Sequence, residues 1–454
     1  PAMMRLLSFF LILLAASEAI AERAPYASTY QMKATTDFVI QNVNIYSGIG
    51  DTHHAIDVLV QHGKIAEIGT ELALLNAERV VPGKGRWLTP GLIDVHSHMG
   101  DYPSPAISST RDGNEATAPN TARVWAEHSV WPQDPQFELA LAGGVTTFQV
   151  LPGSANLFGG RGVTLKNVPA RTVQGMKFPG AAQSLKMACG ENPKRVYGTR
   201  KTPPSTRMGN VAGYREAWAK ATDYLRKLRA HEQDNALPKP DRDLTMETLV
   251  GVLNGEIIVH NHCYRADEMA TMIDIAKEFG YRVGTFHHAV ESYKLADRLA
   301  EEGICSAMWA DWWGSKLELF DGIQQNIALV DQAGACAIVH SDSALGVQRL
   351  NQEAAKALTS ATRMGMDIGR GRAMRWITSN AARALGIDSE TGSIEVGKAA
   401  DLVIWSSDPF SVYSKADLVF IDGHLYFDRA NPRLKPRSDF SLGTQDWLDP
   451  QGSP

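Results

Sequence analysis

The sequence predicts an α/β fold: a (β/α)8 TIM-type barrel with a small composite β-sandwich domain formed from the N- and C-terminal segments. Residues 37–69 alternate apolar and polar side chains in short runs between turn residues, which is typical of antiparallel strands. The same pattern returns near the C-terminus in "TGSIEVGKAADLVIWSSDP" and "DLVFIDGHLYFDR". Between these segments, short apolar runs alternate with amphipathic helices over about 300 residues, as in a barrel.

These patterns also set the expected domain boundaries. We expect a composite domain of residues 22–88 and 386–440, a barrel of residues 89–385 and a C-terminal tail of residues 441–454. Two segments interrupt the strand–helix alternation, because residues 152–210 are rich in Gly, Pro and Asn, and residues 230–242 are polar. Both predict long loops, and long loops at a barrel mouth are commonly functional.

The N-terminus has the charge–apolar–small order of a secretory signal peptide. Arg5 precedes an apolar run over residues 6–16, and a small-x-small cleavage site follows at residues 19–21. The apolar run is too short to span a bilayer comfortably. We therefore expect residues 1–21 to be removed, leaving a periplasmic or secreted protein without stable membrane association. A membrane anchor or a buried N-terminal helix is the alternative.

Composition excludes several classes of partner. The chain has 454 residues and a net charge of -5, without a basic stripe, so we expect no nucleic-acid partner. Four cysteines lack CxxC spacing and lie in or beside apolar runs, where a disulfide and reduced buried thiols are both compatible with the pattern. They are Cys189, Cys263, Cys305 and Cys336.

The stretch "TPGLIDVHSHMG", residues 89–100, ends an apolar strand with two histidines. Because residues i and i+2 of a strand face the same side, His96 and His98 are expected to project together. In a barrel, the C-terminal ends of the strands hold the active site. Two imidazoles at this spacing can chelate one metal ion, so the pair predicts a metal site, with two surface histidines as the alternative.

Later apolar runs also end in side chains that can bind a metal. "EIIVHNHCY" supplies His260 and His262 on one face, and "ACAIVHSDSALG" supplies His340 and Asp342 at the last barrel-like strand. Each alone is better explained as a core or capping residue; Asp342, for example, could cap the following helix. Taken in barrel order, however, the set predicts a metal centre.

A further run, "YRVGTFHHAVE", ends in the adjacent histidines His287 and His288. Neighbouring residues of a strand point to opposite faces, so we expect one of the two to face inward. This run therefore adds one ligand candidate to the set.

These motifs resemble the amidohydrolase superfamily, in its imidazolonepropionase-related, dipeptidase-like branch, several members of which are exported. The resemblance runs from "DFVIQNVNIYSG" through "LTPGLIDVHSH" to "GKAADLVIW" and covers nearly the whole mature chain. It implies two divalent metal ions, with zinc as the first candidate. The ligands it implies are His96, His98, His260, His288 and Asp342, with His262 and His287 as the alternative histidines.

Two-metal members of this family also need an anionic bridge, often a carboxylated lysine. Lys186, in "AAQSLKMACGENPKR", stands where the family lysine would be. Glu191 is the rival, because its carboxylate could bridge two cations directly. An ordinary surface lysine at position 186 is the alternative to both.

The resemblance implies hydrolysis of carbon–nitrogen bonds, mainly amides of dipeptides or N-acyl amino acids. A metal-activated hydroxide would attack, and Asp342 would move the proton to the leaving nitrogen. A cyclic-amide, imidazolonepropionase-like ring-opening hydrolase and a non-catalytic binding protein on the same barrel are the alternatives. The expected partner is a small-molecule or dipeptide substrate, and a homo-oligomer remains open.

Side chains of the predicted mouth loops are candidates for substrate binding. Three tryptophans in "SAMWADWWGSKLE" predict an apolar wall, and nearby cationic side chains could hold a free carboxylate. The alternative is that the tryptophans pack loops against the β domain. The candidates are His128, Arg161, Tyr264, Arg265, Trp309, Trp312 and Lys316.

Overall fold

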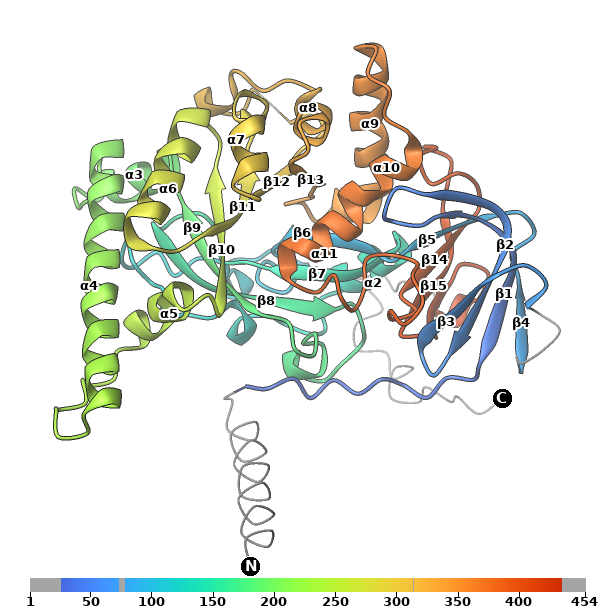
Figure 1. The fold of residues 1–454 in the computed structure, drawn as a ribbon, viewed down its shortest axis with the longest axis horizontal. Coiled ribbons are helices and arrows are strands. Elements are labelled where there is room, and N and C mark those ends of the chain that lie inside the picture. The colour runs from blue at the N-terminus through green and yellow to red at the C-terminus, as the bar shows by residue number, and fades with distance from the viewer. Residues whose placement is uncertain (1–25, 73–77, 313, 435–454) are drawn as a thin grey trace, which may run out of the picture.

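The computed structural model describes residues 26–72, 78–312 and 314–434, which form a barrel with a separate β domain at its side (Figure 1). The expected signal peptide, residues 1–21, and the expected tail, residues 441–454, lie outside the described residues. Within the described part of the chain, no helix has both the length and the apolar character needed to cross a membrane.

Strands from both ends of the chain form one sheet, as the sequence predicts. Its strands are β1 (Phe38–Tyr46), β2 (Thr52–Gln61), β3 (Lys64–Gly69), β4 (Arg79–Pro82), β5 (Trp87–Pro90), β14 (Leu402–Trp405), β15 (Ala416–Ile421) and β16 (His424–Asp428). β5 pairs antiparallel with β14, which places Leu88 opposite Ile404. Phe38 stacks on Phe420 with ring centroids 5.1 Å apart. The blue and red strands therefore lie together in Figure 1.

A second sheet of eight strands forms the barrel and confirms the predicted fold class. Its strands are β6 (Leu92–Ser97), β7 (Val145–Val150), β8 (Phe158–Lys166), β9 (Gln183–Ala188), β10 (Ile257–Cys263), β11 (Val283–His288), β12 (Cys305–Met308) and β13 (Cys336–Val339). They pair in sequence order from β6 to β13.

One barrel strand departs from the parallel pattern. β8 is antiparallel to both β7 and β9, whereas the other neighbouring pairs in this sheet are parallel. The link before β8, residues 151–157, is shorter than the crossover of about a dozen residues that a parallel neighbour needs. The expectation of loops throughout residues 152–210 was therefore wrong. The β8 strand is not recognisable in the sequence, because three of the residues in "FGGRGVTLK" are glycines and glycine does not favour strands.

Helices cover the barrel (Figure 1). They are α2 (Gln136–Ala142), α3 (Glu191–Gly198), α4 (Arg207–Gln233), α5 (Leu244–Leu253), α6 (Ala266–Phe279), α7 (Ala296–Glu301), α8 (Asn326–Gln332), α9 (Leu350–Arg363), α10 (Arg370–Met374) and α11 (Ser379–Leu385). In α6, Met269, Met272 and Ile273 recur on one buried face at helical spacing. The helix ends at Gly280, whose φ of 76° suits the left-handed position that follows a helix.

The barrel closes between its first and last strands through the backbone and one buried carboxylate. The Asp342 amide donates to the His96 carbonyl over 3.0 Å, and the Ser341 amide donates to Asp94 Oδ1 over 3.2 Å. The Ser341 hydroxyl also donates to Asp94. This seam holds the end of β13 beside the end of β6.

Two disulfides link neighbouring barrel strands. One joins Cys189, directly after β9, to Cys263 at the end of β10, and the other joins Cys305 of β12 to Cys336 of β13. The structure therefore selects the disulfide over the reduced thiols.

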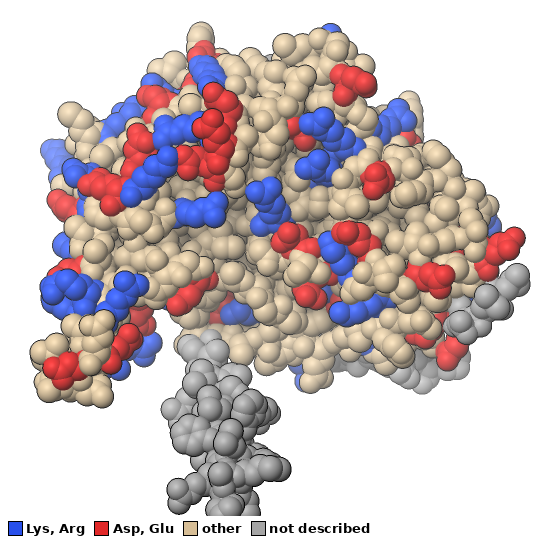
Figure 2. All heavy atoms as spheres, viewed as in Figure 1, with Lys and Arg blue, Asp and Glu red and all other residues tan. Residues whose placement is uncertain are grey.

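Charged side chains of both signs are interspersed over the face of the molecule drawn in Figure 2.

A buried ion cluster joins the barrel to the β domain. Lys166, the last residue of β8, places its Nζ 2.8 Å from Asp422 Oδ2 and 3.6 Å from Asp401 Oδ2. Asp401 precedes β14, and Asp422 lies in the β15–β16 turn. The Tyr30 hydroxyl donates to the same Asp422 oxygen, so the segment before β1 is tied to this cluster as well.

We expect Lys166→Met to destabilise the protein, because it leaves two buried carboxylates without their cation. Removing one partner of a buried ion pair costs about 3–5 kcal/mol. The guanidinium midpoint of unfolding, followed by tryptophan fluorescence, should fall clearly. Lys227→Met, which breaks an exposed pair with Asp223, should leave the midpoint almost unchanged. Equal midpoints for Lys166→Met and wild type would show that the cluster does not tie the two domains together.

Candidate active site

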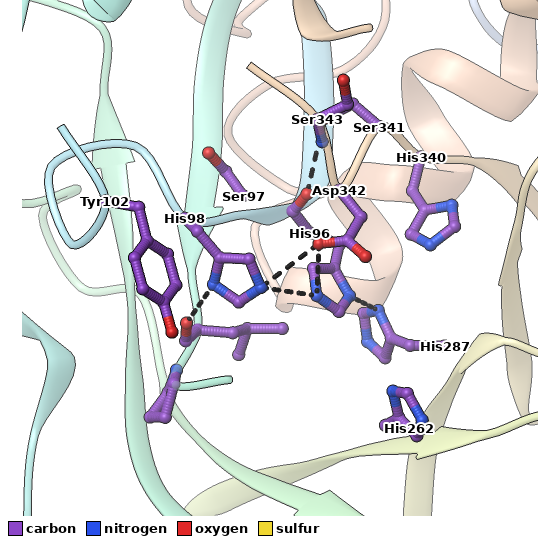
Figure 3. A network of polar contacts seen from close by, with 12 residues as sticks. His96, Ser97, His98, Tyr102, His262, His287, His340, Ser341, Asp342 and Ser343 are labelled. Carbon is purple, nitrogen blue, oxygen red and sulfur yellow. Dashed lines mark hydrogen bonds and ion pairs between the residues drawn. The ribbon is translucent and has the colours of Figure 1, made fainter. Parts of the chain in front are cut away.

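Seven histidines and Asp342 gather at or near the C-terminal ends of the barrel strands. Figure 3 shows part of this cluster, with His96, His98, His262, His287, His340 and Asp342 labelled. All seven come from the ends of four strands, and six are almost fully buried, with His98 partly open. Grouped by strand, they are His96 of β6 with His98 just after it, His260 and His262 of β10, His287 and His288 of β11, and His340 after β13.

The first group that could hold a metal ion consists of His96, His98 and Asp342. His98 Nε2 lies 3.3 Å from His96 Nε2 and 3.2 Å from Asp342 Oδ1, and His96 Nε2 lies 3.6 Å from the same oxygen. The other ring nitrogen of His98, Nδ1, is 2.7 Å from the Leu151 carbonyl oxygen, to which it donates when protonated. With Nδ1 engaged in this way, Nε2 is the ring nitrogen of His98 that faces Asp342.

The second such group consists of His96, His288 and His340. His340 Nε2 lies 2.9 Å from His288 Nδ1. The Trp309 ring stacks on His288, with centroids 4.2 Å apart, and forms a wall on that side of the group. Because His96 belongs to both groups, the two candidate positions adjoin one another.

His287 and His288 both turn towards the cluster, which corrects the expectation that only one faces inward. The alternation of faces holds only while the backbone stays extended. His288 has φ 70°, in the left-handed region, so its ring swings back to within 4.7 Å of the His96 ring. Asp342 has φ 47°, so both positions hold a non-glycine residue in a strained backbone conformation of the kind found at functional sites.

A chain of imidazoles lies behind His96. His287 Nδ1 is 2.9 Å from His96 Nδ1, and His287 Nε2 is 2.8 Å from His260 Nδ1. Both nitrogens of His287 are thus engaged by other rings. His260 and its rival His262 both lie outside the two metal-binding groups, and each has one ring nitrogen without a hydrogen-bond partner among the described residues, Nε2 of His260 and Nδ1 of His262. The His262 ring lies 4.6 Å from the His288 ring between centroids.

The electrostatics of the cluster suit a divalent cation. Burial lowers the pKa of each of five histidines well below its ordinary value or, for His340, to about 4. Their rings are therefore neutral at pH 7 and carry lone pairs. Burial raises the pKa of Asp342, but the hydrogen bond from His98 and nearby positive charge outweigh it and lower the pKa overall. The five are His96, His262, His287, His288 and His340.

Lys186 is fully buried, so the surface alternative is wrong. It pairs with His260 across β9 and β10, and its Nζ donates to the Pro152 carbonyl over 3.0 Å. Burial lowers the pKa of Lys186 to about 8, although Asp342 opposes the shift. Glu191, its rival, begins α3, and among the described contacts its carboxylate forms no hydrogen bond or ion pair with the histidines.

A cationic anchor stands beside the cluster. Lys316 Nζ donates to Tyr264 Oη over 3.0 Å and to Asn192 Oδ1 over 3.1 Å. The Asn192 amide in turn donates to His262 Nε2 over 3.4 Å. Asn192 alone separates the Lys316 ammonium from His262 along this path. Lys316 is half-buried, so its ammonium remains open to a ligand.

The loop that carries Lys316 is clamped by Glu318. This buried carboxylate accepts from the Arg207 guanidinium and from the Glu191 amide, the latter over 2.8 Å. Gly190 makes the approach possible, because a Cβ there would come within 2.8 Å of the Glu318 carboxylate. Burial raises the pKa of Glu318 to about 7, helped by the charge of Glu268.

Three of the predicted substrate residues lie elsewhere. Arg161 is inside β8 rather than in a loop, and it pairs with Leu185 while Gly160 pairs with the inward-facing Lys186. Its guanidinium therefore points outward, where it donates to Thr248 and Gln183 and stacks on Trp125. His128 belongs to the same outer wall, 5.7 Å from Trp125 between ring centroids. Arg265 pairs with exposed Asp267.

Tyr264, Trp309 and Lys316 do lie at the site, and Trp312 stacks on Trp309 at its edge, with 44% of its surface exposed. Sequence reasoning left Asp94, Asn192 and Glu318 out of the site, and it named His340 as a ligand candidate without including it in the expected ligand set. The spacing of Asp94, two residues before His96, could have indicated the first of these. Glu318 carries no such signal, because its partners are distant in the chain.

This chain is similar to known proteins over most of its length. A model described as "Amidohydrolase family" matches residues 87–426. The chain is 32% identical over 419 residues to amidohydrolase tasK of Hapsidospora irregularis, which covers 86% of this chain but 42% of that protein. It is 23% identical over 404 residues to an imidazolonepropionase of Rhizobium rhizogenes, covering 80% of this chain and 90% of that one. The crystal structure of an amidohydrolase from Thermotoga maritima MSB8 has a TM-score of 0.80 and 36% identity, covering 86% of this chain and all of that chain, 100%.

We expect His98→Ala to lose metal, because it removes one of the three donors of the first group. The purified variant, stripped with a chelator and reloaded with zinc, should retain less metal than wild type by elemental analysis. His128→Ala, which removes a histidine from the outer wall, should load like wild type. If His98→Ala binds as much metal as the His128 control does, the first group is not a metal site.

Proposed function

Because this chain belongs to the amidohydrolase family and is an enzyme that hydrolyses carbon–nitrogen bonds, we propose that its substrates are dipeptides or N-acyl amino acids with a free carboxylate. One observation carries the proposal. Half-buried Lys316 donates a hydrogen bond to Tyr264 and another to Asn192. Asn192 in turn contacts His262, so a single residue separates this lysine from the histidine cluster. A carboxylate bound there would place its neighbouring amide bond over the cluster.

We propose two divalent cations, with zinc as the first candidate, because imidazole nitrogens and a carboxylate are the donors that zinc prefers. His96, His98 and Asp342 would hold one ion, and His288 and His340 would take part in holding the other. His262, with its unpartnered Nδ1, is a further donor on that side, and Lys186 is the candidate for a carboxylated bridge. Bound divalent cations supply an acidified water and polarise the scissile carbonyl.

The residues of the chain divide the remaining tasks. Lys316 Nζ and Tyr264 Oη bind the carboxylate of the departing amino acid through charge-assisted hydrogen bonds. Trp309 stacks on His288 and excludes water from one side of the amide. Asp342 accepts a proton at its carboxylate and donates it to the leaving nitrogen, a role for which its lowered pKa keeps it ionised beforehand.

A second candidate function is the opening of a cyclic amide. The similarity to an imidazolonepropionase, at 23% identity, favours it over other chemistries. It would use the same histidines and Asp342. Turnover of imidazolonepropionate without turnover of any dipeptide or N-acyl amino acid would select this candidate over the first.

We also propose that the protein works in the periplasm or outside the cell. Disulfides persist in oxidising compartments, and two link the barrel strands. The signal-peptide pattern of residues 1–21 supports the same location.

We expect Asp342→Asn to lower turnover by at least about a hundredfold, because general acid–base catalysis contributes roughly 10²–10⁴-fold. The change keeps the size of the side chain and one oxygen, so the fold should survive. The test is kcat of metal-loaded variant and wild type on one dipeptide, with metal content measured in parallel. Near-wild-type kcat in a fully loaded variant would contradict the proton transfer assigned to Asp342.

We expect Lys316→Met to raise KM for carboxylate substrates roughly 10- to 100-fold, because a hydrogen bond to a charged group contributes about 1.5–3 kcal/mol. For the same peptide with an amidated C-terminus, wild type and Lys316→Met should have the same KM, because the carboxylate that Lys316 binds is absent. Lys294→Met, at an exposed pair with Asp321, is the matched control and should behave as wild type. An unchanged KM in Lys316→Met would place the carboxylate elsewhere.

A further inference from the structure

A cavity of about 700 Å³ adjoins the histidine cluster. His340 and Trp309 line its inner end, and both belong to the wall of the cluster, since each contacts His288. Lys316 and Tyr264 do not line it. The carboxylate anchor, Lys316 with Tyr264, therefore lies outside the cavity but next to it, because the Tyr264 ring stacks on Trp309 with ring centroids 6.3 Å apart.

One face of α9 forms the long wall of the cavity. The lining residues recur at spacings of three and four, so they share one stripe of the helix. These residues run from Gln352 to Arg363, which gives a wall about 17 Å long at 1.5 Å per residue. Roughly five residues of extended chain span that distance. The residues of α9 that line the cavity include Gln352, Glu353, Lys356, Thr359, Ser360 and Arg363.

The cavity lining combines apolar side chains, among them Trp309, Leu345 and Phe410, with a polar and charged wall on α9. Lys356 Nζ lies 2.8 Å from Asp311 Oδ1 and 2.8 Å from Glu353 Oε2, so these three charges satisfy one another. Arg349 and Arg363 also line the cavity, and neither forms an ion pair with a described residue. A wall of this kind binds a chain that offers hydrogen-bonding groups, because an alkyl chain would desolvate the charges without replacing their hydrogen bonds.

We propose that this cavity is a subsite for a peptidyl group, and that the enzyme removes the C-terminal residue from peptides of three or more residues. The inference rests on the proposed function, because Lys316 and Tyr264 must hold the carboxylate of the departing residue. The acyl side of the amide then extends past Trp309 into the cavity. Water adds its hydroxyl to the carbonyl carbon, the C–N bond breaks, and the leaving nitrogen takes the proton. The products are a free amino acid and a peptide shorter by one residue.

The test is the dependence of kcat/KM on peptide length. Full-length, zinc-loaded enzyme would be given di-, tri-, tetra- and pentapeptides that share one C-terminal residue. We expect kcat/KM to rise at least about tenfold from the dipeptide to the tetrapeptide, because binding energy from remote parts of a substrate lowers the barrier. N-lauroyl amino acid, with the same C-terminal residue, serves as the apolar rival.

Two variants of α9 locate the effect. Ala355 lines the cavity, so Ala355→Trp should fill it and abolish the gain with length while dipeptide turnover stays the same. Thr362→Trp places the same ring on the same helix outside the cavity and should keep the gain. Gln352→Trp is a second filling variant if circular dichroism shows that Ala355→Trp is poorly folded.

The outcomes separate this inference from the proposed function. Dipeptide turnover without a gain for longer peptides, or a gain that survives both filling variants, would overturn the peptidyl subsite alone. A rise in kcat/KM for the lauroyl compound that Ala355→Trp abolishes would show that the cavity binds an alkyl chain and would overturn its assignment to a peptidyl group. Failure to hydrolyse any peptide or N-acyl amino acid would overturn the proposed function itself.

Discussion

The site depends on the seam that closes the barrel between β6 and β13. Asp94 accepts hydrogen bonds from the His96 amide and from Ser341, and the Asp342 amide donates to the His96 carbonyl. One buried carboxylate thus orients the ends of two strands that are remote in sequence. Burial raises the pKa of Asp94 to about 6, against the effect of these hydrogen bonds, so the carboxylate is mostly ionised at pH 7. Without this seam, His98 would not meet Asp342.

The burial of many imidazoles in one place sets the chemistry. Charging any of these rings would require desolvating a cation beside other rings and Lys186, so the histidines remain neutral. Neutral rings present lone pairs, and at His96 and His288 they converge from several strands. The left-handed backbone at His288 and Asp342 adds a cost of roughly 1–3 kcal/mol for each residue. A fold that retains both features holds its donors in place before any ligand arrives, which is the arrangement that metal binding favours.

Much of this was predictable from the sequence, because strand ends and periodicity are local features. The barrel, the composite β domain and the histidine pair of β6 follow from patterns within short segments. The errors arose where tertiary geometry overrides local pattern. His287 and His288 both face inward, where only one was expected to, because His288 has a positive φ that no residue type signals. Arg161 faces outward because it lies in a glycine-rich strand that returns antiparallel, which the period-two pattern does not reveal.

The position of Lys316 in its loop could not be predicted from the sequence either. Lys316 was predicted from its charge and its place after an aromatic run, but its position is set by Glu318, which Arg207 and the Glu191 amide hold from two other elements. The Cys189–Cys263 disulfide joins the strand ends immediately before Gly190 and Tyr264.

The carboxylate anchor therefore rests on a covalent link between β9 and β10, on a glycine that admits Glu318, and on the first turn of α4. The histidines, by contrast, come from the barrel strands themselves. Variation in these loops could change the substrate while the hydrolytic centre stays the same, because Lys316 reaches the histidines through Asn192 and Tyr264, which both contact His262.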